Sequence, residues 1–199
     1  MWNKVRHGLA LQELKNCLGL IGLDFGPYYW VQEGLDNSKI PGLKGDFSGH
    51  TLGFFGPEEM KIIGAKSSAY PESKALERLE KGHKCFGMKY NGEIVAFMWF
   101  VFDEFSLKPY NPRLNEHEAY LSDMYTMREF RGRGVAPYLR YQSYKVLREM
   151  GRDTFYSITD FFNTSAKKFK KKINAKILNF GLGIELFRKF RWIFIIKKY

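Results

Sequence analysis

The sequence predicts a mixed α+β (mixed α/β) fold, in which helices cover both faces of a mixed, mostly antiparallel central sheet. Two strand-like segments flank Asn91-Gly92, a pair typical of a β-hairpin turn. A strand-like run from about Ala119 to Met127 leads through a glycine-rich turn into a helical run that reaches Met150. The order of the expected elements is strand, two helices, three strands, helix, strand, helix and two strands. This order fits neither a doubly wound parallel sheet nor an all-β sandwich.

The first 45 residues are expected to form an N-terminal extension that packs on a main domain of residues 46–199. A helical stretch is expected at about residues 8–23, where Leu11, Leu14 and Leu18 share one face. The segment Pro27–Val31 resembles a short strand. A connector rich in Gly, Pro, Asp and Ser follows from about Leu35 to Gly49 and is expected to be the seam between the two parts.

The main domain is expected to begin with a strand at residues 51–55 and a helix from Gly56. Pro57 stands early in that helix, and acidic residues occupy its first turn. A second helix at residues 71–81 is expected to end at Gly82. The later elements are expected as strands at 84–89, 93–102 and 119–127, a helix to about 150, a strand at 154–159, a helix at 163–173, and strands at about 175–186 and 192–196.

The composition indicates a folded domain with excess basic charge. Of the 199 residues, 45% are hydrophobic and 17% aromatic, which argues against disorder. No run of about 18 uncharged apolar residues is present, so no transmembrane segment is expected. No secretory signal is recognised either. Cys17 and Cys85 form no disulfide framework, and a reducing cytoplasm is the expected location. The histidines are scattered without ligand spacing, so no metal site is expected.

The formal net charge of +11 admits three classes of partner. The protein could bind nucleic acid, contact an anionic membrane or an acidic protein, or act on an anionic ligand. Charge alone does not choose among them.

The segment Arg131-Gly132-Arg133-Gly134-Val135-Ala136 joins the strand before it to the helix after it. A glycine-rich turn at this place presents several backbone N–H groups at the positive end of the helix dipole, an arrangement that binds phosphate. Arg131 and Arg133 add charge-assisted hydrogen bonds to the same anion. The sequence therefore predicts a phosphorylated ligand at this turn.

In two motifs the chain resembles the GNAT superfamily of acyl-CoA-dependent N-acetyltransferases. The family pattern of Arg or Gln, two residues, Gly, one residue, then Gly or Ala is matched from Arg131 to Ala136, although Arg128 replaces the frequent proline before it. On the late helix, Asn163, Ala166 and Phe169 match the spacing of a second signature. Asn163 is also a good helix N-cap, and Phe169 is also a good core residue.

The resemblance implies acetyl-CoA or another acyl-CoA as the donor, and no metal. The pyrophosphate would bind the N–H groups from Gly132 to Ala136, and the pantetheine would pair with the backbone of Met124, Tyr125 and Thr126 as an added strand would. A backbone N–H near Tyr125 would stabilise the tetrahedral oxyanion. The full set of cofactor-binding residues predicted in this way is Met124, Tyr125, Thr126, Arg131, Gly132, Arg133, Gly134, Val135, Ala136, Asn163 and Phe169.

An amine acceptor is protonated at neutral pH, so the reaction needs a base. Glu118, Tyr120 and Ser122 alternate onto one face of their strand, whereas Asp123 faces the other side unless a bulge intervenes. Asp123 or Glu118 is predicted as the base, and Ser122 and Tyr120 are predicted to position water. Lys170 stands where many family members carry the tyrosine that protonates the thiolate. The general acid is therefore open among solvent, Lys170 and another tyrosine, such as Tyr156.

Three functions follow from these observations. The first is an N-acyltransferase that moves an acyl group to a primary amine of a small-molecule acceptor by direct attack. The second uses an acyl carrier protein as donor, which the basic charge suits, or a protein amine as acceptor. The third is a catalytically weak module that binds CoA, RNA or a membrane surface. A homodimer is left open.

The lysine-rich run from Lys167 to Lys172 is expected to be the solvated face of an amphipathic helix. An alternative is that one or two of these lysines hold the 3′-phosphate of CoA. Nucleic acid is not expected as a partner, because the spacing of the run buries Phe169 instead of exposing it.

Overall fold

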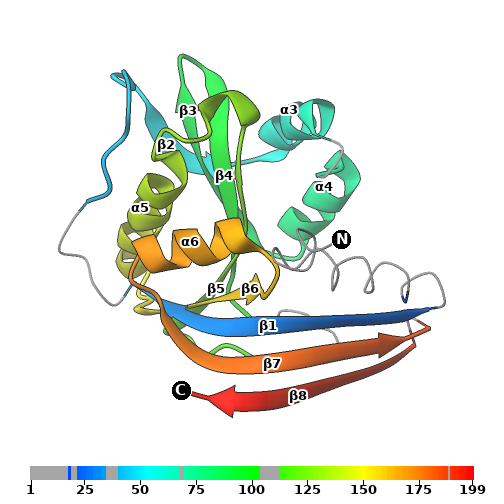
Figure 1. Ribbon diagram of the computed structural model, residues 1–199. Helices are drawn as coiled ribbons and strands as arrows, with labels where there is room; N and C mark the ends of the chain where they lie inside the picture. Colours follow the sequence, from blue (N-terminus) through cyan, green and yellow to red (C-terminus); the bar gives the residue numbers. More distant parts are fainter. Residues whose placement is uncertain (1–17, 19–21, 35–39, 68–69, 104–112, 188) are drawn as a thin grey trace, which may run out of the picture. The chain divides into compact units, whose positions relative to one another are not determined.

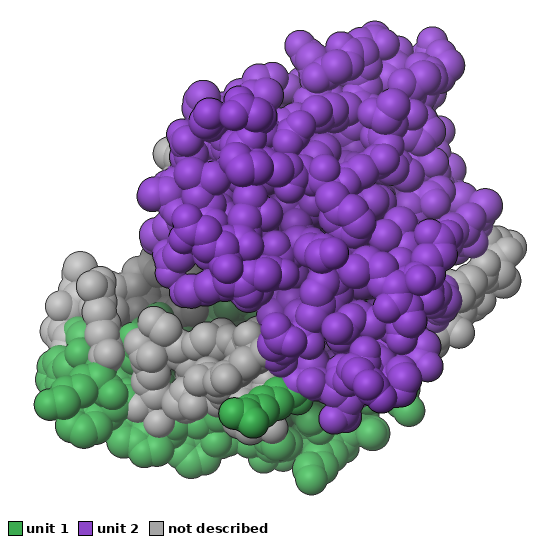
Figure 2. Space-filling model, turned by 180° about the vertical axis from the view of Figure 1, so that it is seen from behind, with its two compact units in different colours: residues 1–33, 104–113, 157–199 green, residues 34–103, 114–156 purple. Residues whose placement is uncertain are grey.

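The computed structural model describes residues 18, 22–34, 40–67, 70–103, 113–187 and 189–199. The chain divides into two compact units, coloured separately in Figure 2. Unit 1 comprises residues 1–33, 104–113 and 157–199, and unit 2 comprises residues 34–103 and 114–156. The helix expected at about residues 8–23 falls almost entirely outside the described residues, and the boundary expected after residue 45 stays a prediction. Among the described helices, none combines the length and the apolar character needed to span a membrane.

Unit 2 is built on a mixed, mostly antiparallel sheet. Its strands are hydrogen-bonded in the order β2-β3-β4-β5-β6, with β6 contributing its first residues. Neighbouring strands are antiparallel from β2 to β5, and β6 runs parallel to β5. The predicted sheet type is confirmed. The elements of unit 2 are β2 (Thr51–Phe55), α3 (Pro57–Lys66), α4 (Glu72–Glu80), β3 (Lys84–Tyr90), β4 (Glu93–Val101), β5 (Glu118–Thr126), the 3₁₀ turn η1 (Arg128–Phe130), α5 (Val135–Glu149) and the start of β6 (Thr154–Asp160).

Helices cover both faces of this sheet (Figure 1), as the sequence predicts. Side chains alternate along β4: Met98 and Phe100 enter the core that contains α5, while Phe97 and Trp99 enter the core that contains α3 and α4. A strand buried on both faces needs apolar residues at every position, which explains the unbroken apolar run of β4. Cys85 lies fully buried in the second core, and burial raises the pKa of its thiol.

The connector predicted at about residues 35–49 packs on unit 2 where it is described. Phe47 is buried in the core beside α5, with its ring 5.2 Å from that of Tyr90. The Lys44 amide donates a 2.8 Å hydrogen bond to the carbonyl oxygen of Arg133, in the glycine-rich turn. Residues 40–50 therefore support that turn, although their composition is that of a spacer.

Unit 1 holds the second part of β6, one helix and three long strands. Its strands follow the order β6-β1-β7-β8, and β7 is antiparallel to both β1 and β8. The strands and the helix expected here are confirmed, and β1 is longer at both ends than the sequence predicts. The elements of unit 1 are β1 (Leu23–Glu33), α6 (Thr164–Lys172), β7 (Lys176–Leu186) and β8 (Phe190–Lys198).

Candidate functional site

A β-bulge interrupts β5 at Asp123 and Met124, a possibility that the sequence leaves open. Tyr125 pairs with Phe97 and Ser122 pairs with Trp99, so two residues of β5 stand opposite one residue of β4. Asp123 occupies the bulge with a φ of 47°. The parallel ladder with β6 covers only residues 118–120 of β5. Towards Thr126, that edge of β5 has no strand partner within the described part of unit 2.

The glycine-rich turn leaves the start of α5 open to an anion. Gly132 and Gly134 have φ values of 77° and 80°, and a Cβ on Gly134 would lie 2.4 Å from the carbonyl oxygen of Gly42. No side chain caps α5, and its first turn contains no acidic residue. Within the described residues, the N–H groups from Gly132 to Ala136 donate no hydrogen bond. Uncommitted donors at a positive helix end fit a pyrophosphate group.

The two arginines of the turn lie against aromatic rings. The Arg131 Nε donates a 3.0 Å hydrogen bond to the carbonyl oxygen of Thr126, and its guanidinium lies 5.4 Å from the centre of the Tyr125 ring. The Arg133 guanidinium lies 5.8 Å from the ring of Phe130. Arg131 therefore links the glycine-rich turn to the end of β5 through a hydrogen bond.

A charged group from α4 holds the two polar side chains at the bulge. Arg78 donates from Nη1 to Asp123 Oδ2 at 2.7 Å and from Nη2 to Ser122 Oγ at 2.9 Å. Its guanidinium lies 4.3 Å from the centre of the Trp99 ring. The bulge turns Asp123 towards the α4 side of the sheet, so Asp123 and Ser122 share one partner. The sequence pattern does not point to Arg78, because it lies 45 residues before Asp123.

Tyr70 and Tyr125 form an aromatic cluster beside this group. The Tyr70 ring lies 5.0 Å from that of Tyr125 and 5.1 Å from that of Phe97. Burial, with a smaller contribution from the charge of Asp123, raises the pKa of Tyr70 to about 12. Tyr70 therefore keeps its proton at neutral pH.

The other predicted base, Glu118, lies at the start of β5 and has both carboxylate oxygens engaged. Oε1 accepts a 3.0 Å hydrogen bond from the Tyr156 hydroxyl, and Oε2 accepts a 2.9 Å hydrogen bond from the Asn115 amide. Burial and the Glu118 hydrogen bond raise the pKa of Tyr156 to about 12. Tyr120, which is predicted to position water, is half-buried on β5 between Glu118 and Ser122.

The remaining predicted cofactor residues, Asn163 and Phe169, lie in unit 1. Asn163 is the N-cap of α6, and its side chain accepts a 2.9 Å hydrogen bond from the Ala166 amide. Phe169 is half-buried on α6.

The Lys170 side chain of α6 points towards the buried residues of unit 1 and is only 11% exposed. The run from Lys167 to Lys172 is therefore not wholly the solvated face that the sequence predicts. Its Nζ donates a 2.6 Å hydrogen bond to Ser157 Oγ and forms an ion pair with Glu33. The Ser157 hydroxyl in turn donates a hydrogen bond to the Glu33 carboxylate. Glu33 and Ser157 are 1% exposed. A charge this deep requires a paired partner, and here that partner lies 137 residues away in the sequence. The helix pattern alone could not reveal it.

Similar solved structures share this fold at low sequence identity. A GNAT-family acetyltransferase from Novosphingobium aromaticivorans has 16% identity and a TM-score of 0.55, with 83% of this chain and 66% of that chain covered. A GNAT-family acetyltransferase from Colwellia psychrerythraea has 18% identity and a TM-score of 0.56, with 89% and 62% covered. The glucosamine N-acetyltransferase region of a fungal multi-domain β-N-acetylglucosaminidase has 14% identity and a TM-score of 0.57, with 85% and 22% covered.

The chain thus spans less than two thirds of the length of each of these proteins. No curated protein matches it. The sequence model of the acetyltransferase (GNAT) family matches residues 55–174, which include the bulged strand, the glycine-rich turn, α5 and α6. This chain belongs to the GNAT family of acetyltransferases.

Proposed function

We propose that this protein is an N-acyltransferase that moves an acyl group, most simply acetyl, from acyl-CoA to a primary amine of a small molecule. The observation that carries the proposal is the open start of α5, where five consecutive N–H groups lack an acceptor within the described chain. Membership of the GNAT family supports acyl transfer. The donor would supply the acyl group as an activated thioester.

The donor site proposed in unit 2 runs from the turn to the bulge. The N–H groups from Gly132 to Ala136 would bind the pyrophosphate, as anions bind at helix N-termini. The unpartnered edge of β5 at Met124, Tyr125 and Thr126 would hydrogen-bond the pantetheine amides as a sheet edge bonds an added strand. Asn163 and Phe169, which lie in unit 1, stay predictions from the family resemblance.

Asp123 is the base that we propose. Its Oδ2 bonds Arg78, but its Oδ1 accepts no hydrogen bond from any described residue, whereas both oxygens of Glu118 are engaged. Asp123 also lies two residues from Tyr125, whose N–H is the proposed donor to the oxyanion. Ser122 and Tyr120 would hold water that relays the proton from the amine.

In the proposed reaction, the amine nitrogen attacks the thioester carbonyl carbon and the C–S bond breaks. The proton lost by the amine passes to Asp123, and the departing thiolate takes up a proton. Tyr70 is the acid proposed for this second transfer, because it stays protonated at neutral pH and touches Tyr125.

For the acceptor, an amine on a small polar molecule is proposed, in line with the glucosamine N-acetyltransferase region among the similar structures. A second candidate is an acyl carrier protein as donor or a protein amine as acceptor. The net charge of +11 favours that candidate, because carrier proteins are acidic.

Acyl-CoA binding is tested first by thermal shift with acetyl-CoA, longer acyl-CoAs and free CoA. Gly134→Ala should abolish the shift, because the new methyl group would collide with the Gly42 carbonyl and distort the turn. Gly92→Ala is the matched control, since Gly92 has a nearly identical φ of 79° in an open hairpin turn. The absence of a shift with every CoA compound in the wild-type protein would overturn the proposal.

A second pair of variants separates binding from folding. Ala136→Glu places a negative charge in the first turn of α5, where it favours the helix dipole but repels a pyrophosphate. This variant should keep its stability and lose CoA binding, while Ala136→Gln should keep both. Thiol release over a panel of amines and an acyl carrier protein then distinguishes the enzyme from a binding module and identifies the donor class.

A further inference from the structure

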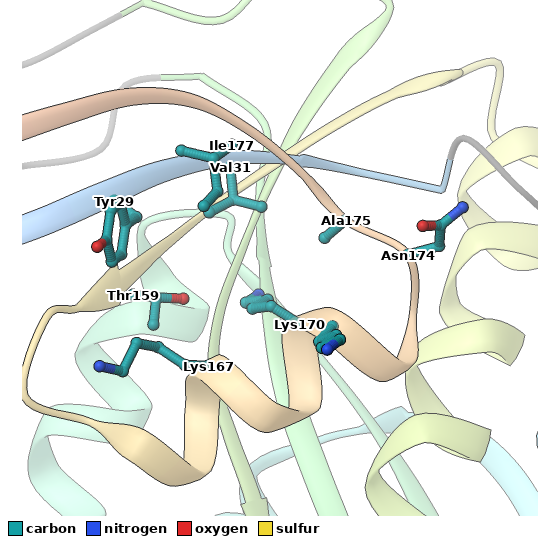
Figure 3. Close-up of a pocket in the computed structure, with 9 residues that line it drawn as sticks. Tyr29, Val31, Thr159, Lys167, Lys170, Asn174, Ala175 and Ile177 are labelled. Carbon is teal, nitrogen blue, oxygen red and sulfur yellow. The ribbon is translucent and has the colours of Figure 1, made fainter. Parts of the chain in front are cut away.

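A cavity of about 350 Å³ lies between α6 and strands β1, β6 and β7 of unit 1 (Figure 3). Its volume falls in the range of roughly 300–1,000 Å³ found for pockets that hold small organic ligands. One part of its wall is apolar and is made by Tyr29, Val31 and Ile177. Its lining contains none of the residues proposed above to bind the pyrophosphate or the pantetheine, although it includes Lys167, Lys170 and Lys171 of the lysine-rich run.

The cavity contains a buried hydroxyl group without a partner. Thr159 is only 3% exposed and lines the cavity, and its Oγ1 has no hydrogen-bond partner among the described residues. A buried hydroxyl that makes no hydrogen bond costs about 1–3 kcal/mol, so such groups usually serve a ligand or a water. Thr159 is therefore a hydrogen-bonding point prepared for a polar atom inside the cavity.

The charged groups around the cavity make it positive. Lys167, Lys170 and Lys171 line it, and no acidic side chain does so among the described residues. Lys170 is paired with Glu33, which lies outside the lining. Among the described residues, the Lys167 ammonium group interacts with the face of the Phe161 ring, whose centre lies 4.8 Å from Nζ. An aromatic face does not neutralise an ammonium group, so the cavity keeps an excess of positive charge.

We propose that this cavity binds a small organic anion with an apolar body. The anionic group would accept hydrogen bonds from the Thr159 hydroxyl on β6 and the Lys167 ammonium group on α6, which both line the cavity (Figure 3). The apolar body would pack against Tyr29, Val31 and Ile177. All the residues that line the cavity belong to unit 1, whereas the pyrophosphate site proposed above belongs to unit 2.

The first test is calorimetry of the whole chain with four probes that each contain a linear chain of six carbons: hexanoate, hexyl phosphate, hexanamide and hexylamine. Hexanoate or hexyl phosphate should bind at least about tenfold more tightly than the amide or the amine, because charge-assisted hydrogen bonds are the stronger ones. The two anions then distinguish a carboxylate from a phosphate headgroup. Equal binding of hexanamide, or no binding of either anion, would overturn the proposal.

Variants then locate the binding. Lys167→Gln and Thr159→Val should each weaken the preferred anion by about tenfold, with unchanged circular dichroism. Lys168→Gln is the matched control, because Lys168 is exposed on the same helix and does not line the cavity. An equal loss in Lys168→Gln would mean that only the charge of the surface matters. Gly134→Ala should keep anion binding, so failure of the acyl-CoA proposal would leave this result unaffected.

Discussion

At the scale of single residues, the contact between Arg78 and the bulge organises the candidate site of unit 2. One guanidinium bonds Asp123 and Ser122 and lies on the Trp99 ring. A planar guanidinium can do all three at once, which a lysine ammonium cannot. The arrangement leaves one oxygen of Asp123 open and orients it, as a base needs.

Asp123→Asn should lower kcat by about a hundredfold or more, because the amide cannot take a proton. Glu118→Gln should change kcat by less than about tenfold, because Glu118 bonds Tyr156 and Asn115 instead of a reacting group. The measurement is steady-state thiol release as a function of pH for both variants. A larger loss in Glu118→Gln than in Asp123→Asn would indicate that Glu118 is the base.

Arg78→Leu should cost about 1–2 kcal/mol of folding stability, because it removes the ion pair and the cation–π contact together. Arg78→Lys should recover part of this loss. Lys81→Gln is the control on the same helix, since the exposed pair of Lys81 and Glu77 should contribute little to stability. Urea unfolding of the three variants measures these values, and full recovery of stability by Arg78→Lys would contradict the bidentate role.

At the scale of elements, the sequence predicts most of the fold because local chemistry determines it. Asn91 and Gly92 both adopt positive φ, at 49° and 79°, as a two-residue hairpin turn requires. The alternation along β5 and the glycine-rich turn before α5 could be predicted for the same reason. The inward position of Lys170 could not, because helical spacing does not show which face of α6 meets Glu33, a residue of β1.

Asn163→Ala should destabilise the protein by about 1 kcal/mol, because it leaves the Ala166 amide at the start of α6 without its acceptor. Asn163→Asp should keep most of the stability, since a carboxylate accepts the same hydrogen bond and favours the helix dipole. Thermal unfolding monitored by circular dichroism compares the two. If Asn163→Ala lowers acyl-CoA affinity without changing stability, the residue acts as a ligand contact instead of a cap.

At the scale of the whole molecule, the titrating groups of unit 2 limit the pH range of stability. The hydrogen bond from Lys89 lowers the pKa of Glu59 below its usual 4.5, and burial lowers the pKa of His83 below its usual 6.5. Both groups stabilise the fold above these values, and the stabilisation is lost as the pH falls through the folded-state pKa. Burial raises the pKa of Tyr70 and Tyr156, so their stabilisation is present below pH 10 and is lost as the pH rises towards 12.

The urea midpoint should therefore be highest between about pH 6.5 and pH 10 and should fall on both sides. Glu59→Gln should flatten the acid side, and Tyr70→Phe should flatten the alkaline side. Tyrosinate absorbance followed in parallel identifies the groups that ionise as the protein unfolds. A midpoint that stays constant from neutral pH to pH 12 would contradict the burial of the two tyrosines.

The hydrogen bond between the Lys44 amide and the Arg133 carbonyl makes the hydrogen exchange of that amide a measure of the state of the glycine-rich turn. The Lys44 amide proton is held by the carbonyl of the glycine-rich turn, so it exchanges with solvent deuterium only when residues 40–50 and the turn separate. A ligand that fixes the turn must slow this exchange, and one that displaces the segment must speed it. The exchange rate of one backbone proton thus reports occupancy of the turn without any catalysed reaction.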